Sequence, residues 1–143
     1  MTNLRWISVL GVLLCLLTIG CGKEGYSTPG AVKLSGTLTD NGEPLFVEGI
    51  ENGTGMIVVG FHAIVEGEAG PEISSAHVDL DGNFEIPQGI EPGEYLVTVH
   101  QWEPYPQKDL LKGKFTARKS KIIRQIDGDT VLDIDLANPE GDG

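Results

Sequence analysis

Cysteine is almost absent from this chain, which has two among its 143 residues, Cys15 and Cys21. Both lie near the N-terminus, so everything after residue 21 is free of thiols. A domain without thiols cannot form an internal disulfide, use a cysteine nucleophile or hold a soft metal ion through thiolates. Disulfide scaffolds and thiol enzymes are therefore excluded.

Basic residues are scarce as well. The chain has 10 Lys and Arg residues against 21 Asp and Glu residues, which gives a formal charge of −11 at pH 7. Proteins that hold nucleic acids neutralise phosphates mainly with clustered Lys and Arg side chains. The charge balance therefore argues against nucleic acid as a partner.

Long amphipathic helices are not indicated by the sequence. The 20 Gly and 8 Pro residues favour many turns, and no apolar stripe with helical spacing continues beyond about two turns. The length allows one small domain in addition to the terminal segments. The composition thus predicts a single all-β domain.

The first 20 residues have the pattern of a signal peptide. Arg5 is their one cation, an uncharged apolar run extends from Trp6 to Ile19, and the small residue Gly20 precedes Cys21. Such a run is short for a membrane span. An uncleaved membrane helix over residues 1–20 is the alternative interpretation.

Residues 17–21, Leu-Thr-Ile-Gly-Cys, resemble the lipobox of bacterial lipoproteins, with Thr18 where leucine is usual. The resemblance implies that diacylglycerol is attached to the Cys21 thiol and that Cys21 begins the mature protein. Each buried CH₂ contributes about 0.8 kcal/mol, so two or more acyl chains hold a protein stably on a bilayer. We therefore expect a lipid anchor on the exported side of the cell membrane or outer membrane, and Gly22 in place of Asp favours the outer one.

The mature chain is expected to contain a flexible tether over residues 21–30, a domain over 31–138 and a polar, frayed tail over 139–143. Within the domain, alternating apolar and polar residues predict about seven short strands. Residues 56–65 are apolar on both faces except at His62, as expected of a central strand. The spacing predicts an antiparallel, immunoglobulin-like or transthyretin-like β-sandwich. The expected inward-facing residues outside 56–65 are Val32, Leu34, Gly36, Leu38, Ala76, Val78, Leu80, Phe84, Ile86, Tyr95, Val97, Val99, Leu132, Ile134 and Leu136.

Several stretches of the domain resemble the carboxypeptidase regulatory-like (transthyretin-like) domains found in small lipoproteins of planctomycete-type bacteria. These stretches are residues 32–45, 55–61, 81–86, 92–97 and 112–136. The shared residues are turn glycines, prolines and inward-facing apolar residues, so the resemblance implies a fold. It also implies a non-catalytic module, and it supplies no functional residues.

The acidic string over residues 79–85 has oxygen ligands at alternate positions, which suggests calcium binding. An EF-hand loop, however, requires glycine at its sixth position, whereas Gly82 stands fourth in this string. A tight hairpin turn at residues 81–83 explains the same sequence without an ion. The histidines His62, His77 and His100 lie on three predicted strands without metal-binding spacing, so no metal, cofactor or catalytic residue is predicted.

Basic residues gather in one segment, where seven of them lie between positions 108 and 124 beside a single acid, Asp109. The formal charge of this segment is near +6, and that of the rest of the mature chain is near −18. The segment could contact anionic head groups, an acidic glycan or an acidic partner, or be a solvated loop that offsets the acidic majority. Its basic residues are Lys108, Lys112, Lys114, Arg118, Lys119, Lys121 and Arg124.

Two aromatic residues, Trp102 and Tyr105, precede the basic segment and are flanked by prolines. Exposed aromatic side chains can stack on sugar rings or anchor a protein partner, or they can cap the end of a sandwich. The predicted partner surface consists of Trp102, Tyr105, Lys112, Lys114, Arg118 and Lys119.

Together these observations predict a non-catalytic lipoprotein, anchored to the lipid bilayer through Cys21, that presents a β-sandwich to an envelope protein or a glycan. A carbohydrate-binding or calcium-binding module is the alternative function. A small hydrolase has the least support, because the sequence shows no Gly-x-Ser-x-Gly nucleophile motif.

Overall fold

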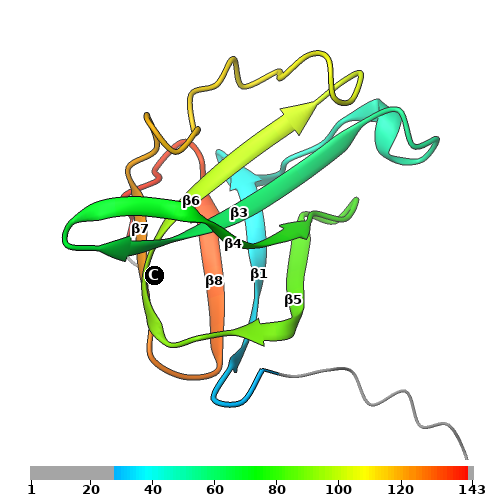
Figure 1. Cartoon of the computed structure of the whole chain (residues 1–143). Coiled ribbons are helices and arrows are strands. Elements are labelled where there is room, and N and C mark those ends of the chain that lie inside the picture. The colour runs from blue at the N-terminus through cyan, green and yellow to red at the C-terminus, as the bar shows by residue number, and fades with distance from the viewer. Residues whose placement is uncertain (1–27, 142–143) are drawn as a thin grey trace, which may run out of the picture.

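The computed structural model describes residues 28–141. The predicted signal peptide and Cys21 lie outside these residues. The described part forms eight β-strands and one short 3-10 helix (Figure 1). In chain order the elements are β1 (Val32–Asp40), β2 (Glu43–Pro44), η1 (Glu48–Ile50), β3 (Met56–Val65), β4 (Glu68–His77), β5 (Asn83–Ile90), β6 (Gly93–Trp102), β7 (Ile122–Ile126) and β8 (Thr130–Asp135).

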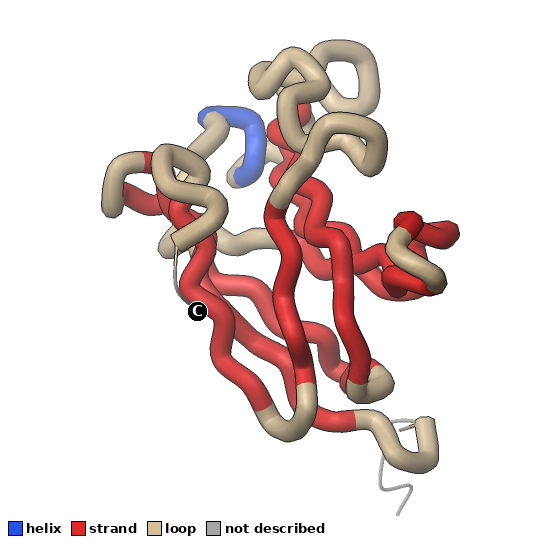
Figure 2. The backbone as a smooth tube through the Cα atoms, turned by 90° about the vertical axis from the view of Figure 1, so that its left-hand side faces the viewer, coloured by secondary structure: helices blue, strands red, loops and turns tan. Residues whose placement is uncertain are grey.

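The strands form two four-stranded sheets that enclose one core (Figures 1 and 2). In the first sheet, β1 lies between β5 and β8, and the short β2 pairs with the end of β1. The second sheet has the order β4-β3-β6-β7 and is antiparallel throughout. The predicted all-β sandwich is confirmed, and so is the central position of residues 56–65.

One strand pairing and two turns differ from the antiparallel sandwich with hairpin connections that alternation and turn residues suggest. Strand β8 pairs with β1 in parallel, with Leu34 opposite Thr130 and Thr39 opposite Asp135. The turns at residues 79–83 and 127–129 each lead from one sheet to the other, so neither closes a hairpin. Alternation shows which face of a strand is buried, whereas the neighbouring strand is chosen by packing between distant segments.

The core follows the alternating pattern closely. The predicted inward residues of β1, β5, β6 and β8 are buried, apart from the partly buried Val32 at the start of β1. At the centre Phe61 contacts the rings of Phe84 and Tyr95, with centroids 6.3 and 6.4 Å away. Leu80 was predicted to face inward but is 43% exposed, because it lies in the turn between the sheets, where the two-residue period ends.

One basic side chain is enclosed rather than solvated. Arg124 lies on the inward face of β7 and is 8% exposed. Its guanidinium donates to the carbonyl oxygens of Ile123, Pro139 and Gly141. These bonds hold residues 139–141 beside β7, so the expectation of a frayed tail is wrong for these residues.

The sandwich has two distinct ends, shown in both views (Figures 1 and 2). The start of β1 lies at one end, where Val32 pairs with Ile90 just before the start of β6. Strand β6 then runs for ten residues to Trp102 at the other end. Because an extended strand rises about 3.3 Å per residue, these ends are roughly 30 Å apart.

Candidate functional site

The connection between β6 and β7, residues 103–121, begins at the end of the sandwich opposite the start of β1 and then returns alongside β6, with Asp109 opposite Trp102, Phe115 opposite Val99 and Ser120 bonded to Val97 (Figure 1). It contains Tyr105 and most of the basic segment, and it begins directly after Trp102. We use the name end surface for two residues at the end of β6 together with the aromatic and basic residues of the connection. These residues are His100, Trp102, Tyr105, Lys108, Lys112, Lys114, Arg118, Lys119 and Lys121.

The Asp109 carboxylate holds this connection in place through hydrogen bonds. The sequence showed Asp109 as the one acid of the basic segment and did not predict this role. Its Oδ1 accepts hydrogen bonds from the backbone N–H groups of Gln101 (3.3 Å) and Leu111 (3.0 Å), and its Oδ2 accepts one from the N–H of Gly113 (3.1 Å). Oδ2 also lies 3.4 Å from Nδ1 of His100. The carboxylate therefore joins the end of β6 to two turns of the connection.

We expect Asp109→Ala to lower the free energy of unfolding by about 2 kcal/mol, because three backbone N–H groups lose a charged acceptor in a partly buried site. Hydrogen exchange should accelerate at the amides of Leu111 and Gly113 while the amides of β3 stay protected. Asp127→Ala is the matched control, since Asp127 is exposed and accepts from the Gln125 side chain. Unchanged exchange at both amides would contradict the assigned role of Asp109.

A second segment supports the same end of the sandwich. The loop around η1 contacts the start of the connection, where Oε1 of Glu103 accepts from the N–H of Gly49 at 2.8 Å. The N–H of Tyr105 donates to the carbonyl oxygen of Thr54 at 2.7 Å. The backbone that carries Tyr105 is thus bonded to a loop from another part of the chain, which fixes the place of its ring.

The predicted aromatic pair belongs to a group of three rings. His100 and Trp102 stack with centroids 5.3 Å apart and planes inclined by 13°, and Tyr105 meets Trp102 edge-on at 6.3 Å. Trp102 is partly buried, whereas Tyr105 is 47% exposed. The sequence analysis overlooked His100 here, although residues two apart on a strand face the same side.

Of the seven basic residues in the basic segment, six have exposed side chains, and the seventh is the buried Arg124 described above. Within residues 28–141 the two ion pairs are His62–Glu72 and His100–Asp109, so the six exposed cations have no carboxylate partner there. Lys114 places its ammonium 4.9 Å from the centroid of the Phe115 ring. The end surface is therefore strongly basic on an otherwise acidic protein.

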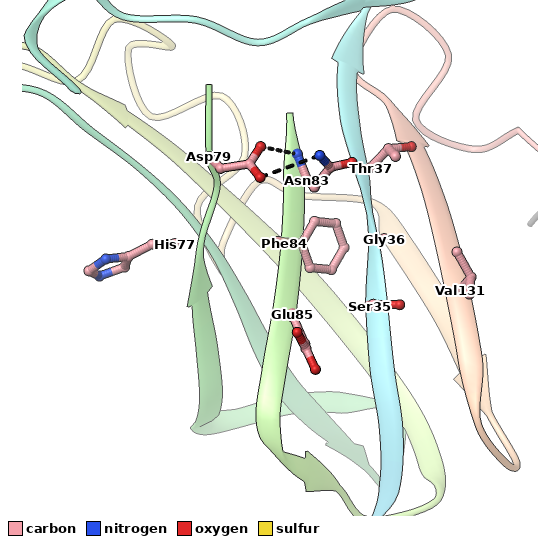
Figure 3. Close-up of a pocket in the computed structure, with 9 residues that line it drawn as sticks. All are labelled: Ser35, Gly36, Thr37, His77, Asp79, Asn83, Phe84, Glu85 and Val131. Atoms are coloured by element: carbon pink, nitrogen blue, oxygen red, sulfur yellow. Dashed lines mark hydrogen bonds between the residues drawn. The ribbon is translucent and has the colours of Figure 1, made fainter. Parts of the chain in front are cut away.

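The acidic string at residues 79–85 forms a turn. Oδ1 of Asp79 accepts from the N–H groups of Asp81 and Asn83, and Oδ2 accepts from the Asn83 side chain. Figure 3 shows this carboxylate facing Asn83 at the upper edge of a shallow hollow, while Glu85 lies further along β5. The hydrogen bond from the backbone of Asn83 lowers the pKa of Asp79 below its ordinary value of 3.8.

We expect Asp79→Ala to cost about 1 kcal/mol of stability at neutral pH, because two turn amides lose their acceptor. A depressed pKa in the folded state stabilises the protein above pH 3.8, and this contribution disappears as the pH falls through the folded pKa. Urea denaturation at pH 7 and pH 3 measures both effects. Asp81→Ala is the control, and an equal loss for both variants at pH 7 would contradict the assigned role of Asp79.

The three histidines lie on adjacent strands without forming a site together. His77 and His100 are both opposite Val58, whereas His62 lies four residues further along β3. The Nδ1 atom of His62 is 3.0 Å from the carbonyl oxygen of Gly70. In the part of the chain that the structure describes, no three His, Cys, Asp or Glu residues are grouped to hold a metal ion.

The predicted lipidation site, Cys21, lies outside the described residues, as do the signal peptide and most of the tether. Between residues 28 and 141, no helix is both long and apolar enough to cross a membrane.

Comparison of the chain with protein-family models, curated proteins and solved structures finds no significant match.

Proposed function

We propose that this protein is a lipid-anchored bacterial lipoprotein whose β-sandwich is a non-catalytic interaction module at the cell envelope. The anchor is Cys21, whose thiol carries diacylglycerol and which becomes the first residue of the mature protein, and the module is of the carboxypeptidase regulatory-like kind. The main support from the fold is the separation of its two ends, because the chain enters the domain at one end and the end surface lies at the other (Figure 1).

This separation suits a tethered module. A domain attached through the start of β1 carries its tether at the end farthest from Trp102, so the tether does not cover the opposite end and a partner in the envelope or outside the cell can reach it. The end surface combines exposed cations with a fixed aromatic group, and Tyr105 is 47% exposed. Exposed aromatic and basic side chains are common anchors of binding interfaces.

The anchor is tested by intact-mass and peptide mass spectrometry of protein extracted from membranes of a lipoprotein-competent host. We expect a chain that begins at Cys21 and carries acyl chains on its first residue. A chain that retains residues 1–20, or begins at an unmodified Cys21, would overturn the proposal.

A further inference from the structure

We propose that the end surface binds an acidic polysaccharide, a sugar polymer with repeated carboxylate groups, which lies along residues 103–121. The inference deepens the proposed function and rests on it for the direction that the surface faces. Binding itself depends on the side chains of the end surface and can be measured without the anchor.

The charge of the connection favours a polyanion. Six exposed cations follow one another along a connection that runs from the end of β6 back to its middle, and residues 28–141 provide no carboxylate partner for them. A row of cations of this kind attracts a polymer with anionic groups at intervals, because each additional unit can pair with another cation. A small anion would use only part of this row.

An aromatic group lies at one end of this row. Trp102 stacks with His100 and lies nearly perpendicular to Tyr105, and Tyr105 is the ring of the three that is most exposed, at 47%. Lys108 lies in the same turn, because its backbone N–H donates to Pro104 and its carbonyl oxygen accepts from Glu103. The C–H faces of sugar rings pack on the negative faces of aromatic rings, so a charged sugar polymer can use both kinds of side chain.

The connection is also preorganised by hydrogen bonds. Asp109 bonds to three backbone amides within and beside the connection, and the η1 loop bonds to its first residues. A surface that is already ordered loses less conformational entropy on binding. The connection is therefore better prepared to bind than a solvated loop of the same composition.

Two other polyanions fit less well. Double-stranded DNA carries one charge per about 1.7 Å of its axis, and the acidic remainder of the domain repels so dense a polymer. In the proposed arrangement the chain comes from the anchoring membrane to the start of β1, which is roughly 30 Å from Trp102 along β6. That separation is about three to four times the Debye length at physiological salt, so the field of head groups near the start of β1 is screened at Trp102.

The test measures binding of the full chain, purified in nonionic detergent, to polygalacturonate at low salt. Dextran serves as the uncharged sugar polymer, polyglutamate as the acidic polymer without sugars, and vesicles of anionic lipid as the membrane control. The main variant replaces Lys112, Lys114, Arg118 and Lys119 together with glutamine. Its single-site comparison is Lys114→Gln against Lys33→Gln, because Lys33 is exposed on β1 away from the end surface.

We expect polygalacturonate to bind and to weaken as salt rises, and dextran not to bind. The quadruple variant should lose at least about tenfold in affinity, since four cations that attract the carboxylates of the polymer become neutral. Tyr105→Ala should lose roughly fivefold, within the range expected of an exposed aromatic contact, and Tyr105→Phe should keep most of the affinity. Lys33→Gln should bind like the wild type, unlike Lys114→Gln.

Three outcomes would overturn the proposal: no binding of polygalacturonate, equal binding of polyglutamate, or stronger binding to anionic than to uncharged vesicles, a comparison in which insertion of the acyl anchor is the same for both. Failure of the anchor can be distinguished from these outcomes. A wild-type chain that binds polygalacturonate but carries no acyl chains would remove the proposed membrane location and leave the binding site in place.

Discussion

Replacing Cys21 with serine is expected to move the protein from the membrane fraction to the soluble fraction and to remove its acyl mass. The thiol is the atom that receives the diacylglycerol, and serine has no thiol. Stable attachment to a bilayer requires more than one fatty chain, and each buried CH₂ group contributes about 0.8 kcal/mol. A variant that carries no fatty chain should therefore associate with the membrane at least about a thousandfold more weakly than the wild type. Fractionation combined with mass spectrometry measures both changes.

Cys15→Ser is the matched control, since it removes the other thiol of the chain. This variant should stay in the membrane fraction with a normal acyl mass, because Cys15 is expected to leave with the signal peptide. A wild-type chain that remains in the membrane and retains residues 1–20 would instead support the uncleaved membrane helix. A wild-type chain without acyl mass would remove the lipid anchor altogether.

Gly36→Ala is expected to produce a large loss of stability, about 3 kcal/mol. Gly36 lies in the middle of β1, paired with Phe84 of β5 on one side and Leu132 of β8 on the other. A Cβ atom built there overlaps the backbone carbonyl oxygen of Leu132 and comes within 2.6 Å of the tip of the Phe84 ring. The carbonyl belongs to the sheet and cannot move freely, so the added methyl group strains a packed core.

Urea denaturation followed by circular dichroism measures this loss. Gly128→Ala is the control, because a Cβ at that position meets nothing within 4 Å. The free energy of unfolding of this variant should change by less than about 1 kcal/mol. It rises slightly if the backbone at Gly128 suits alanine, because alanine lowers the conformational entropy of the unfolded chain. Equal unfolding midpoints for wild type and Gly36→Ala would contradict this prediction, because they would mean that the structure accommodates the methyl group beside Leu132 and Phe84 without loss of stability.

Alternation of apolar and polar residues was sufficient to predict which strand faces are buried. Leu34, Leu38, Val97 and Ile134 are each no more than 1% exposed, as expected from their positions. The rule succeeds because successive side chains of a strand point to opposite faces of its sheet. It failed at Leu80, where the chain leaves one sheet for the other and the two-residue period no longer applies.

The order of strands was beyond such reasoning. Residues 120–126 and 130–136 are separated by a short acidic turn that resembles a hairpin connection, yet β7 and β8 belong to different sheets. Strand β8 reaches β1, nearly a hundred residues earlier in the chain, and Asp133 accepts a hydrogen bond from the Thr37 hydroxyl there. Pairings of this kind depend on contacts that local sequence does not encode.

The candidate site was predicted in its composition but not in its organisation. Trp102, Tyr105 and the lysines were recognisable as exposed residue types in an unusual pattern. His100 and Asp109 were not connected with them, because a stacked ring and an acceptor of three backbone amides are recognised only when the chain is folded. Arg124 counted as one more surface cation until its place on the inward face of β7 was known.

The amino-acid sequence by itself determined the all-β class, the inward and outward faces of most strands and the uneven distribution of charge, since each depends on residue type and short-range spacing. The tertiary structure alone decided which strands are neighbours, which of the seven basic side chains reach solvent, and that the end surface lies opposite the start of β1. These features depend on how distant segments share one core, because burial and pairing there are settled jointly by both sheets.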